Sequence, residues 1–214
     1  MTHTPVDAAR GGGLAAALRE GTKEHHVRAE RHPLQAAIAR GKVDRRTYGR
    51  IVAQNRALQE ALEGALDAGA EREPRLARVF APHHRRLANF DADLDALGVE
   101  DRGVVPATDW ACGWIRGLGE REPLSLLGVL YVLEGSTNGG QFLAHPLRAA
   151  LGLQGNEGLS SLNPHGDRTR ELWAGFRASV DSLALEPAEA DAIIAAAQET
   201  FDVVGRVLDG VAGS

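Results

Sequence analysis

A histidine and a glutamate near the start of the chain have the spacing of a metal ligand and its supporting carboxylate. His26 and Glu30 are four positions apart, so on a helix the carboxylate can accept a hydrogen bond from one imidazole nitrogen. The other nitrogen is then a neutral, well-oriented metal ligand. A single helical histidine is more often an ordinary surface or core residue, so His26 requires support from elsewhere in the sequence.

Two cations are expected on the same face of that helix. Arg19 and Lys23 are four positions apart, and Lys23 precedes His26 by three. Positive charges beside a metal ligand can neutralise carboxylates on a bound cofactor. The alternative is a solvated helix face with weak ion pairs, and for either cation taken singly that alternative is the stronger interpretation.

A third feature is the segment 134–141, which reads Glu-Gly-Ser-Thr-Asn-Gly-Gly-Gln within what is otherwise one long buried helix. Each interior glycine costs about 1 kcal/mol of helix stability relative to alanine, so Gly135, Gly139 and Gly140 need a compensating reason. We expect a planar ligand to lie against this backbone. A close helix–helix crossing is the alternative.

The elements that position these residues are all expected to be helices, because sustained alternation is absent and aromatic residues make up only 5% of the chain. The clearest helix begins at about Pro187 and carries an apolar stripe to Val211. A second follows Asp44, a predicted N-cap, and continues to Leu66. Shorter helices are expected at 13–31, 34–40, 74–97, 109–118 and 168–183, with 152–166 as the longest polar connection.

Composition favours one compact globular domain. The chain has 214 residues, 43% of them hydrophobic, which is enough for a sizeable core. We expect residues 13–212 to form a single helical domain after a disordered stretch, 1–12. The net charge of -5 comes without a long basic run, so a nucleic-acid surface is not expected.

Cysteine use and hydropathy indicate the compartment. Cys112 is the only cysteine, which excludes an internal disulfide framework and fits a reducing cytoplasm. No apolar run approaches the ~20 residues that span a bilayer, and the N-terminus lacks a signal-peptide core. We therefore expect a cytoplasmic protein with no membrane association.

Three segments, in the same order along the chain, resemble the heme oxygenase family. The string Thr22-Lys-Glu-His-His-Val-Arg-Ala-Glu30 matches the family's Thr-Lys-Glu-X-His-X-X-Ala-Glu pattern, in which the histidine is the axial ligand of heme iron; His26, not His25, occupies that place. The stretch Gly135-Ser-Thr-Asn-Gly-Gly-Gln141 resembles the family's distal Gly-Asp-X-X-Gly-Gly-Gln. Arg177, upstream of Ser182-Leu183, and Phe201 resemble the family's near-terminal helices, so the likeness runs from about residue 14 to 208.

The resemblance implies a fold and a reaction. The fold is a single-domain, all-α bundle with a glycine-kinked distal helix. The reaction is cleavage of heme by O2 and reducing equivalents to biliverdin, carbon monoxide and ferrous iron, with heme b as both substrate and cofactor. Electrons would come from an external ferredoxin- or flavoprotein-type donor, since the chain has no dinucleotide-binding fingerprint.

The resemblance also implies roles for individual residues. His26 would bind the iron, with Glu30 supporting the imidazole. Cofactor-binding roles fall on Gly140 and Phe201, and Arg19, Lys23 and Arg177 would hold the heme propionates. The catalytic distal wall would consist of Gly135, Ser136 and Gly139, whose backbone steers the reacting oxygen toward one meso carbon of the ring.

Ser136 departs from the aspartate that many members of the family carry at this position. Serine can hydrogen-bond water but carries no charge at neutral pH, so Glu134, Thr137, Asn138 or a more distant arginine is a candidate for its role in proton delivery. Two other functions remain open. One is a heme carrier or sensor without turnover; the other is a cofactor-free helical hydrolase or scaffold in which Cys112 is a nucleophile, although that residue is better explained as part of the core.

Overall fold

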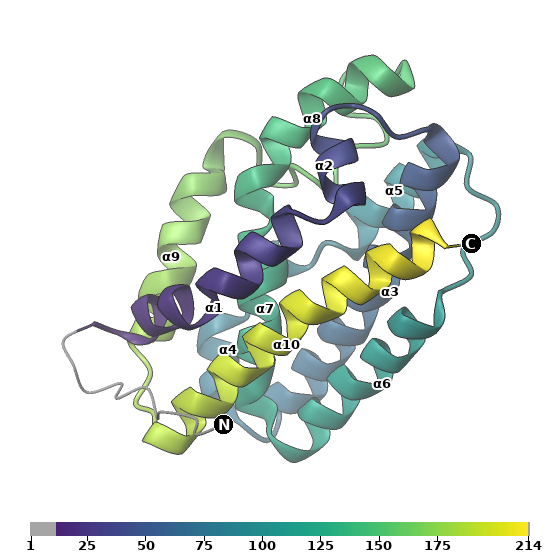
Figure 1. Ribbon diagram of the computed structural model, residues 1–214. Helices are drawn as coiled ribbons and strands as arrows, with labels where there is room; N and C mark the ends of the chain where they lie inside the picture. Colours follow the sequence, from purple (N-terminus) through teal and green to yellow (C-terminus); the bar gives the residue numbers. More distant parts are fainter. Residues whose placement is uncertain (1–11, 214) are drawn as a thin grey trace.

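The computed structural model describes residues 12–213, and this part of the chain folds into helices without a strand (Figure 1). The expected all-helical class is confirmed. The stretch predicted to be disordered, 1–12, lies outside the described residues except for Gly12. The helices are α1 (Leu14–Glu30), α2 (Pro33–Ala39), α3 (Arg45–Ala70), α4 (Pro74–Val79), α5 (Leu87–Leu97), α6 (Pro106–Arg121), α7 (Leu126–Gly135), α8 (Thr137–Leu151), α9 (Thr169–Asp181) and α10 (Pro187–Ala212), with short 3-10 turns at Pro82–His84, Pro123–Ser125 and Gly166–Arg168.

The helix starts follow their capping residues. Asp44 caps α3, because its Oδ1 accepts a hydrogen bond of 2.7 Å from the Thr47 backbone N–H. Pro187 occupies the first turn of α10, as predicted. The helix predicted over 109–118 begins earlier, at Pro106, for the same reason.

The single helix predicted over 74–97 is wrong. It consists of α4, a 3-10 turn and α5. Pro82 accounts for the break, because the residue before a proline is driven out of the helical region, and Ala81 is extended with φ -100° and ψ 161°. The break matters for the site, since it places Arg86 at the N-cap of α5 instead of in the middle of a long helix.

The long helix expected around the glycines is also divided, into α7 and α8, which meet at Ser136. Three consecutive polar side chains there bond to the backbone carbonyl three residues earlier. The bonds run from Ser136 Oγ to Leu133 O (2.7 Å), from Thr137 Oγ1 to Glu134 O (2.8 Å) and from Asn138 Nδ2 to Gly135 O (3.0 Å). Such bonds compete with the helical ladder, so the polar side chains as well as the glycines explain the division.

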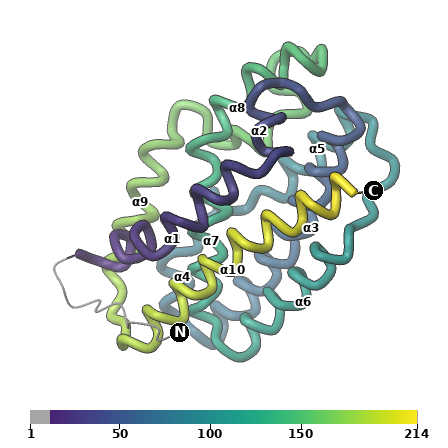
Figure 2. Tube along the Cα trace, in the orientation of Figure 1, coloured from purple at the N-terminus to yellow at the C-terminus, as the bar shows by residue number. Residues whose placement is uncertain are grey.

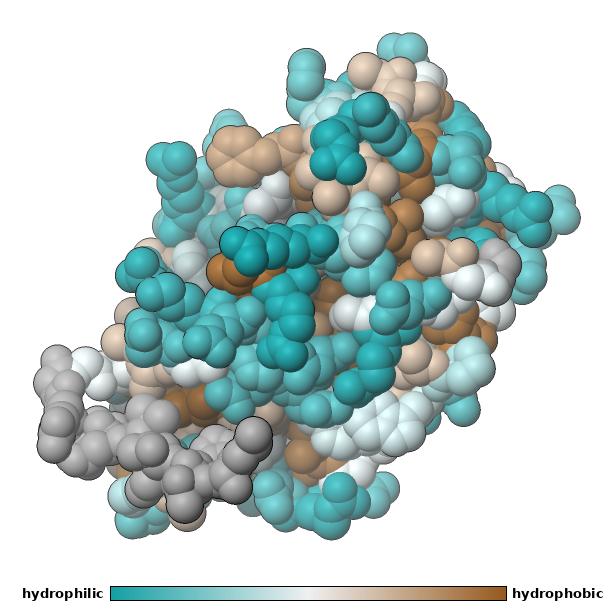
Figure 3. Space-filling model, viewed as in Figure 1, coloured by the Kyte–Doolittle hydropathy of each residue, from teal (hydrophilic) through white to brown (hydrophobic). Residues whose placement is uncertain are grey.

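The helices pack around α7, which contacts α10 and α3. Helix α1 lies along α10 and also contacts α9, while α2 and α8 pack together at one end of the molecule (Figures 1 and 2). Gly128 allows the close approach of α7 to α10: a Cβ there would lie 2.1 Å from the carbonyl oxygen of Ile193. Hydrophilic residues dominate the face where α1 crosses the molecule (Figure 3).

Cys112 is a core residue of α6. It is buried, and its Sγ donates to the carbonyl of Ala57 at 3.4 Å. Burial raises the pKa of the thiol, which disfavours the thiolate that a nucleophile requires. Across residues 12–213, no helix combines the length and the hydropathy needed to cross a membrane.

Candidate functional site

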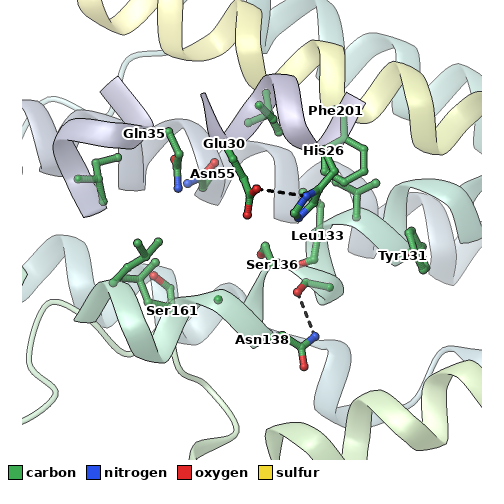
Figure 4. Close-up of a pocket in the computed structure, with 18 of the residues that line it drawn as sticks. His26, Glu30, Gln35, Asn55, Tyr131, Leu133, Ser136, Asn138, Ser161 and Phe201 are labelled. Atoms are coloured by element: carbon green, nitrogen blue, oxygen red, sulfur yellow. Dashed lines mark hydrogen bonds and ion pairs between the residues drawn. The ribbon is translucent and has the colours of Figure 1, made fainter. Parts of the chain in front are cut away.

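A cavity of about 780 Å³ opens between α1 and the α7–α8 turn (Figure 4). Its volume is in the range of sites for cofactors and other small molecules. Residues from the first two helices, from α3, from both sides of the α7–α8 turn and from α10 line it. The walls therefore come from segments that are far apart in the sequence.

His26 extends from α1 into this cavity, on the side opposite Ser136 and Asn138 (Figure 4). Its Nδ1 lies 3.6 Å from Glu30 Oε2, and the two side chains are 54% and 66% exposed. This distance is an ion-pair contact, longer than a hydrogen bond. Phe201 of α10 meets the imidazole edge to face, with the ring centroids 5.5 Å apart, so the ring is oriented by a second helix.

The neighbouring His25 is turned away and held elsewhere. Its Nδ1 lies 3.0 Å from Asp202 Oδ1 on α10, and it is absent from the lining of the main cavity. Of the two adjacent histidines, His26 is thus the one with its ring in the cavity.

The three candidate anion-binding cations differ in placement. Arg19 and Lys23 line the cavity and are exposed. Arg177, on α9, is exposed and is not part of the lining. Burial raises the pKa of the Tyr131 phenol, and a hydrogen bond with Thr22 and the charges of Arg19 and Arg177 oppose that rise.

The glycines of the α7–α8 turn have different environments. Gly135 and Gly139 line the cavity together with Ser136. A Cβ on Gly139 would meet nothing within 4 Å, whereas a Cβ on Gly140 would lie 1.8 Å from the carbonyl oxygen of Leu162. Gly139 therefore leaves open space for a ligand, and Gly140, which does not line the cavity, permits a close backbone crossing.

Behind this turn lies a buried ionic triad, which we define as Arg86, Glu134 and His165. Arg86 is 4% exposed and lines the cavity. Its Nη2 donates to the Leu133 carbonyl at 2.9 Å, and its Nε lies 3.8 Å from Glu134 Oε2. His165 Nε2 lies 2.7 Å from Glu134 Oε1. Sequence reasoning raised Glu134 and an unspecified arginine separately but missed Arg86 and His165, because only the fold brings them together.

Glu134 is ionised in this environment. Burial favours the neutral acid, but the hydrogen bond from His165 and the charge of Arg86 outweigh it and hold the pKa below its usual value. A carboxylate can only accept hydrogen bonds, so His165 is the donor. The isolated charged residue in the apolar sequence of α7 was the one available signal of this triad.

Two buried polar groups that line the cavity have no hydrogen-bond partner among the described residues: the hydroxyl of Tyr48 and Nε of Arg86. Burial raises the pKa of the Tyr48 phenol, and the charge of Asp93 raises it further. Buried polar groups are normally satisfied by protein, water or ligand. These two therefore give the cavity a place for ordered water or a polar ligand atom.

The cavity fits a metal that brings most of its own ligands. Within residues 12–213, no three histidine, cysteine, aspartate or glutamate side chains gather as a metal site. A macrocycle needs only an axial ligand such as the His26 imidazole, flat space such as that over Gly139, and cations for its acidic substituents. The residues present thus suit a metalloporphyrin with carboxylate groups.

Comparison with known proteins agrees with this geometry. The model of the family described as "Heme oxygenase" matches residues 12–209. The chain is 29% identical to the heme oxygenase of Takifugu rubripes over 88% of this chain and 70% of that protein. It is 28% identical to heme oxygenase 2 of Synechocystis over 91% of this chain and 81% of that protein.

Solved structures show the same fold. The heme oxygenase of Leptospira interrogans superposes with a TM-score of 0.85 at 26% identity, covering 92% of this chain and 98% of that one. Heme oxygenase-1 of Synechocystis, solved in complex with heme, superposes with a TM-score of 0.87 at 22% identity, covering 94% and 93% of the two chains.

Proposed function

The chain belongs to the heme oxygenase family, and from that premise we propose that the cavity between α1 and the α7–α8 turn holds heme b, with His26 as its axial ligand. The reaction of the family is cleavage of heme to biliverdin, carbon monoxide and ferrous iron. Heme supplies the iron that activates oxygen and is itself the ring that is cleaved. The protein supplies placement, hydrogen bonds and exclusion of water.

The observation that carries the proposal is the placement of His26 across the cavity from Ser136 and Asn138 (Figure 4), next to Gly139, whose Cβ position is open. The imidazole is exposed to the cavity, and Phe201 fixes its plane. Glu30 lies beside Nδ1, at 3.6 Å, which leaves Nε2 free for the metal. One wall can therefore bind iron while the other lies flat against the ring.

Charge at the mouth orients the substrate. Arg19 and Lys23 line the cavity from the face of α1 that carries His26, and Arg177 is exposed on α9, outside the lining. We propose that they bind the two propionates. This anchoring fixes the rotation of the ring and so selects the meso carbon that is attacked.

The distal wall consists of backbone and small side chains. Gly139 lets the chain approach the ring closely, while the Cβ position of Gly135 faces Trp173; we propose that the backbone of this turn directs the reaction toward the ring edge. The Ser136 hydroxyl donates to Leu133 O, so toward the cavity it can only accept. Ser136 lacks the charge of the usual aspartate, and we propose that water bound to the unsatisfied polar atoms of Tyr48 and Arg86 contributes to proton delivery.

Electrons must come from a separate protein. We propose a ferredoxin- or flavoprotein-type donor that docks at the open mouth of the cavity, near Arg19 and Lys23. A cationic rim favours an acidic partner and makes association salt-dependent.

Hemin titration followed by turnover tests the proposal. The expected result is a stoichiometric complex that, with ascorbate and O2, loses its Soret band and yields biliverdin identified by chromatography. A stable complex whose Soret band persists would instead indicate a heme carrier or sensor. Absence of a stoichiometric complex would exclude both.

A further inference from the structure

The buried ionic triad is expensive for the fold. Arg86 and Glu134 are 4% and 1% exposed, and removing two such charges from water carries a large desolvation penalty that their pairing must offset. Their pairing is incomplete, since both Arg86 Nε and Glu134 Oε2 lack a hydrogen bond within the described residues. A well-packed apolar pair would serve stability as well or better.

The contacts of Arg86 converge on the α7–α8 turn. Its Nη2 donates to Leu133 O at 2.9 Å, and the Ser136 hydroxyl donates to that same oxygen at 2.7 Å. The carbonyl of Leu133 is therefore shared by a residue of the cavity wall and a buried arginine of another helix. Glu134, the next residue along the chain, holds the guanidinium from the other side at 3.8 Å.

The backbone and guanidinium of Arg86 are also held by residues outside that turn. The Arg86 backbone N–H donates to Glu63 Oε1 at 2.8 Å, and Nη2 also donates to Gln59 Oε1 at 3.2 Å. Both acceptors lie on α3. Arg86 thus connects a rigid helix to the turn.

His165, the third residue of the triad, connects the loop between α8 and α9 to Glu134. His165 precedes the Gly166–Arg168 turn and donates to Glu134 at 2.7 Å. In the same loop, the Leu162 carbonyl packs against Gly140. The distal wall is therefore held from behind at two places, by charge at Glu134 and by backbone contact at Gly140.

We propose that Arg86 is a positioning residue for the distal wall: with Glu134 as its counter-ion, it fixes the Leu133 carbonyl and through it the height of Ser136 above the cavity. The proposal rests on the proposed function, since the height of the turn matters only if a ligand lies beneath it. Arginine suits this role because Nη2 can donate to the Leu133 carbonyl while Nε stays within ion-pair distance of Glu134, whereas lysine offers a single point charge.

Three variants and a matched control test this role. Arg86→Met leaves Glu134 buried without its counter-ion. The double variant Arg86→Met/Glu134→Gln removes both charges and keeps an oxygen to accept from His165. Arg86→Lys retains the charge without the fork. Arg85→Met is the control, because Arg85 pairs with Asp67 on the surface and does not line the cavity.

The first measurement needs no heme. The Ser136 N–H donates to Val132 O at 3.1 Å and the Gly140 N–H to Ser136 O at 3.2 Å. In the heme-free protein, we expect hydrogen exchange at these two amides to be roughly tenfold faster in all three Arg86 variants, in line with loss of a buried charged hydrogen bond. The Arg85→Met protein should exchange like wild type.

The second measurement uses carbon monoxide bound to ferrous heme as a probe of the distal wall. In the ferrous heme–CO complex, we expect the C–O stretching band to shift or split in the double variant and in Arg86→Lys, while Arg85→Met keeps the wild-type band. A purely structural role predicts that the double variant, free of unpaired charge, is wild type in both measurements, and that result would overturn the proposal. If wild type binds no hemin, the proposed function fails, and the exchange data alone still show whether Arg86 holds the turn.

Discussion

The rings of His26 and Phe201 meet at an interplanar angle of 83°, with centroids 5.5 Å apart, across the contact between α1 and α10. An edge-to-face contact of this kind is worth about 1 kcal/mol beyond the buried area. This contact orients the plane of the exposed His26 imidazole. The other contact of the ring given above, to Glu30, is longer than a hydrogen bond at 3.6 Å. The candidate ligand is therefore oriented by an aromatic ring from the other end of the sequence.

Replacing His26 with alanine should remove the axial ligand. We expect the hemin complex of His26→Ala to lose the wild-type Soret spectrum and to regain it when imidazole is added. His25→Ala is the matched control, because His25 bonds Asp202 outside the main cavity; it should keep the spectrum and lose about 1 kcal/mol of stability. An unchanged spectrum in His26→Ala would remove the ligand assignment.

Neutralising the cations at the mouth should weaken hemin binding. For Arg19→Gln and Lys23→Gln we expect the Kd for hemin to rise several-fold, up to about tenfold each, because exposed charges contribute roughly 1 kcal/mol. The effect should shrink at high salt. Arg28→Gln is the comparison, since Arg28 shares the helix but pairs with Asp202. Equal Kd values in all four proteins would exclude a role in propionate binding.

Substitutions at the two adjacent glycines of the α7–α8 turn, Gly139 and Gly140, should have different effects. Gly139→Leu adds a side chain in open space, so thermal stability should stay near wild type while turnover falls or the biliverdin isomer changes. Gly140→Ala places a Cβ against the Leu162 carbonyl, and such overpacking should cost about 2 to 3 kcal/mol. Unfolding curves and product chromatography check both. A Gly139→Leu protein with normal turnover and the normal isomer would show that no ring lies beneath this wall.

The free energy of unfolding should decrease as the pH drops through the range in which His84 takes up a proton. Burial lowers the pKa of this histidine from 6.5 to about 4. The unfolded chain therefore takes up a proton at higher pH than the folded one does, and folding loses stability as pH drops from 6.5 toward 4. The full effect is about 3 kcal/mol.

In wild type the Ala81 backbone N–H donates a hydrogen bond of 3.0 Å to His84 Nδ1. The His84→Asn variant keeps a side-chain acceptor for this N–H. Its free energy of unfolding, measured in urea at several pH values, should lie below that of wild type at pH 7 but decline less between pH 6.5 and 5. His145→Asn, at an exposed position, should keep the wild-type slope. A wild-type slope in His84→Asn would contradict the burial argument.

Local patterns accounted for much of the fold. Asp44 and Pro187 marked helix starts because capping depends on a few adjacent residues, and the spacing of His26 and Glu30 placed both on one helix face. The predicted helix over 74–97 failed because one proline, Pro82, outweighed a favourable apolar pattern. Boundaries set by a single residue are thus easy to misjudge.

The back of the site was beyond sequence reasoning for a different reason. Arg86, Glu134 and His165 are separated by long stretches of chain, and no periodicity links them. Gly140 was assigned to the ligand together with Gly139, and only the position of Leu162 separates their environments. Contacts of this kind arise from tertiary packing, and the spacing of residues along a single sequence does not predict them.

The composition of the α7–α8 turn has a consequence for the lifetime of the protein. Residues 135–139 contain no thiol, thioether, phenol, indole or imidazole, and the hydroxyl and amide groups of Ser136, Thr137 and Asn138 are engaged with backbone carbonyls. Sulfur side chains are the ones most readily damaged by oxidants, and the single cysteine lies buried in α6. Under the proposed function this turn faces activated oxygen, and residues 135–139 themselves offer it no readily oxidised side chain, so repeated turnover should leave this stretch chemically intact.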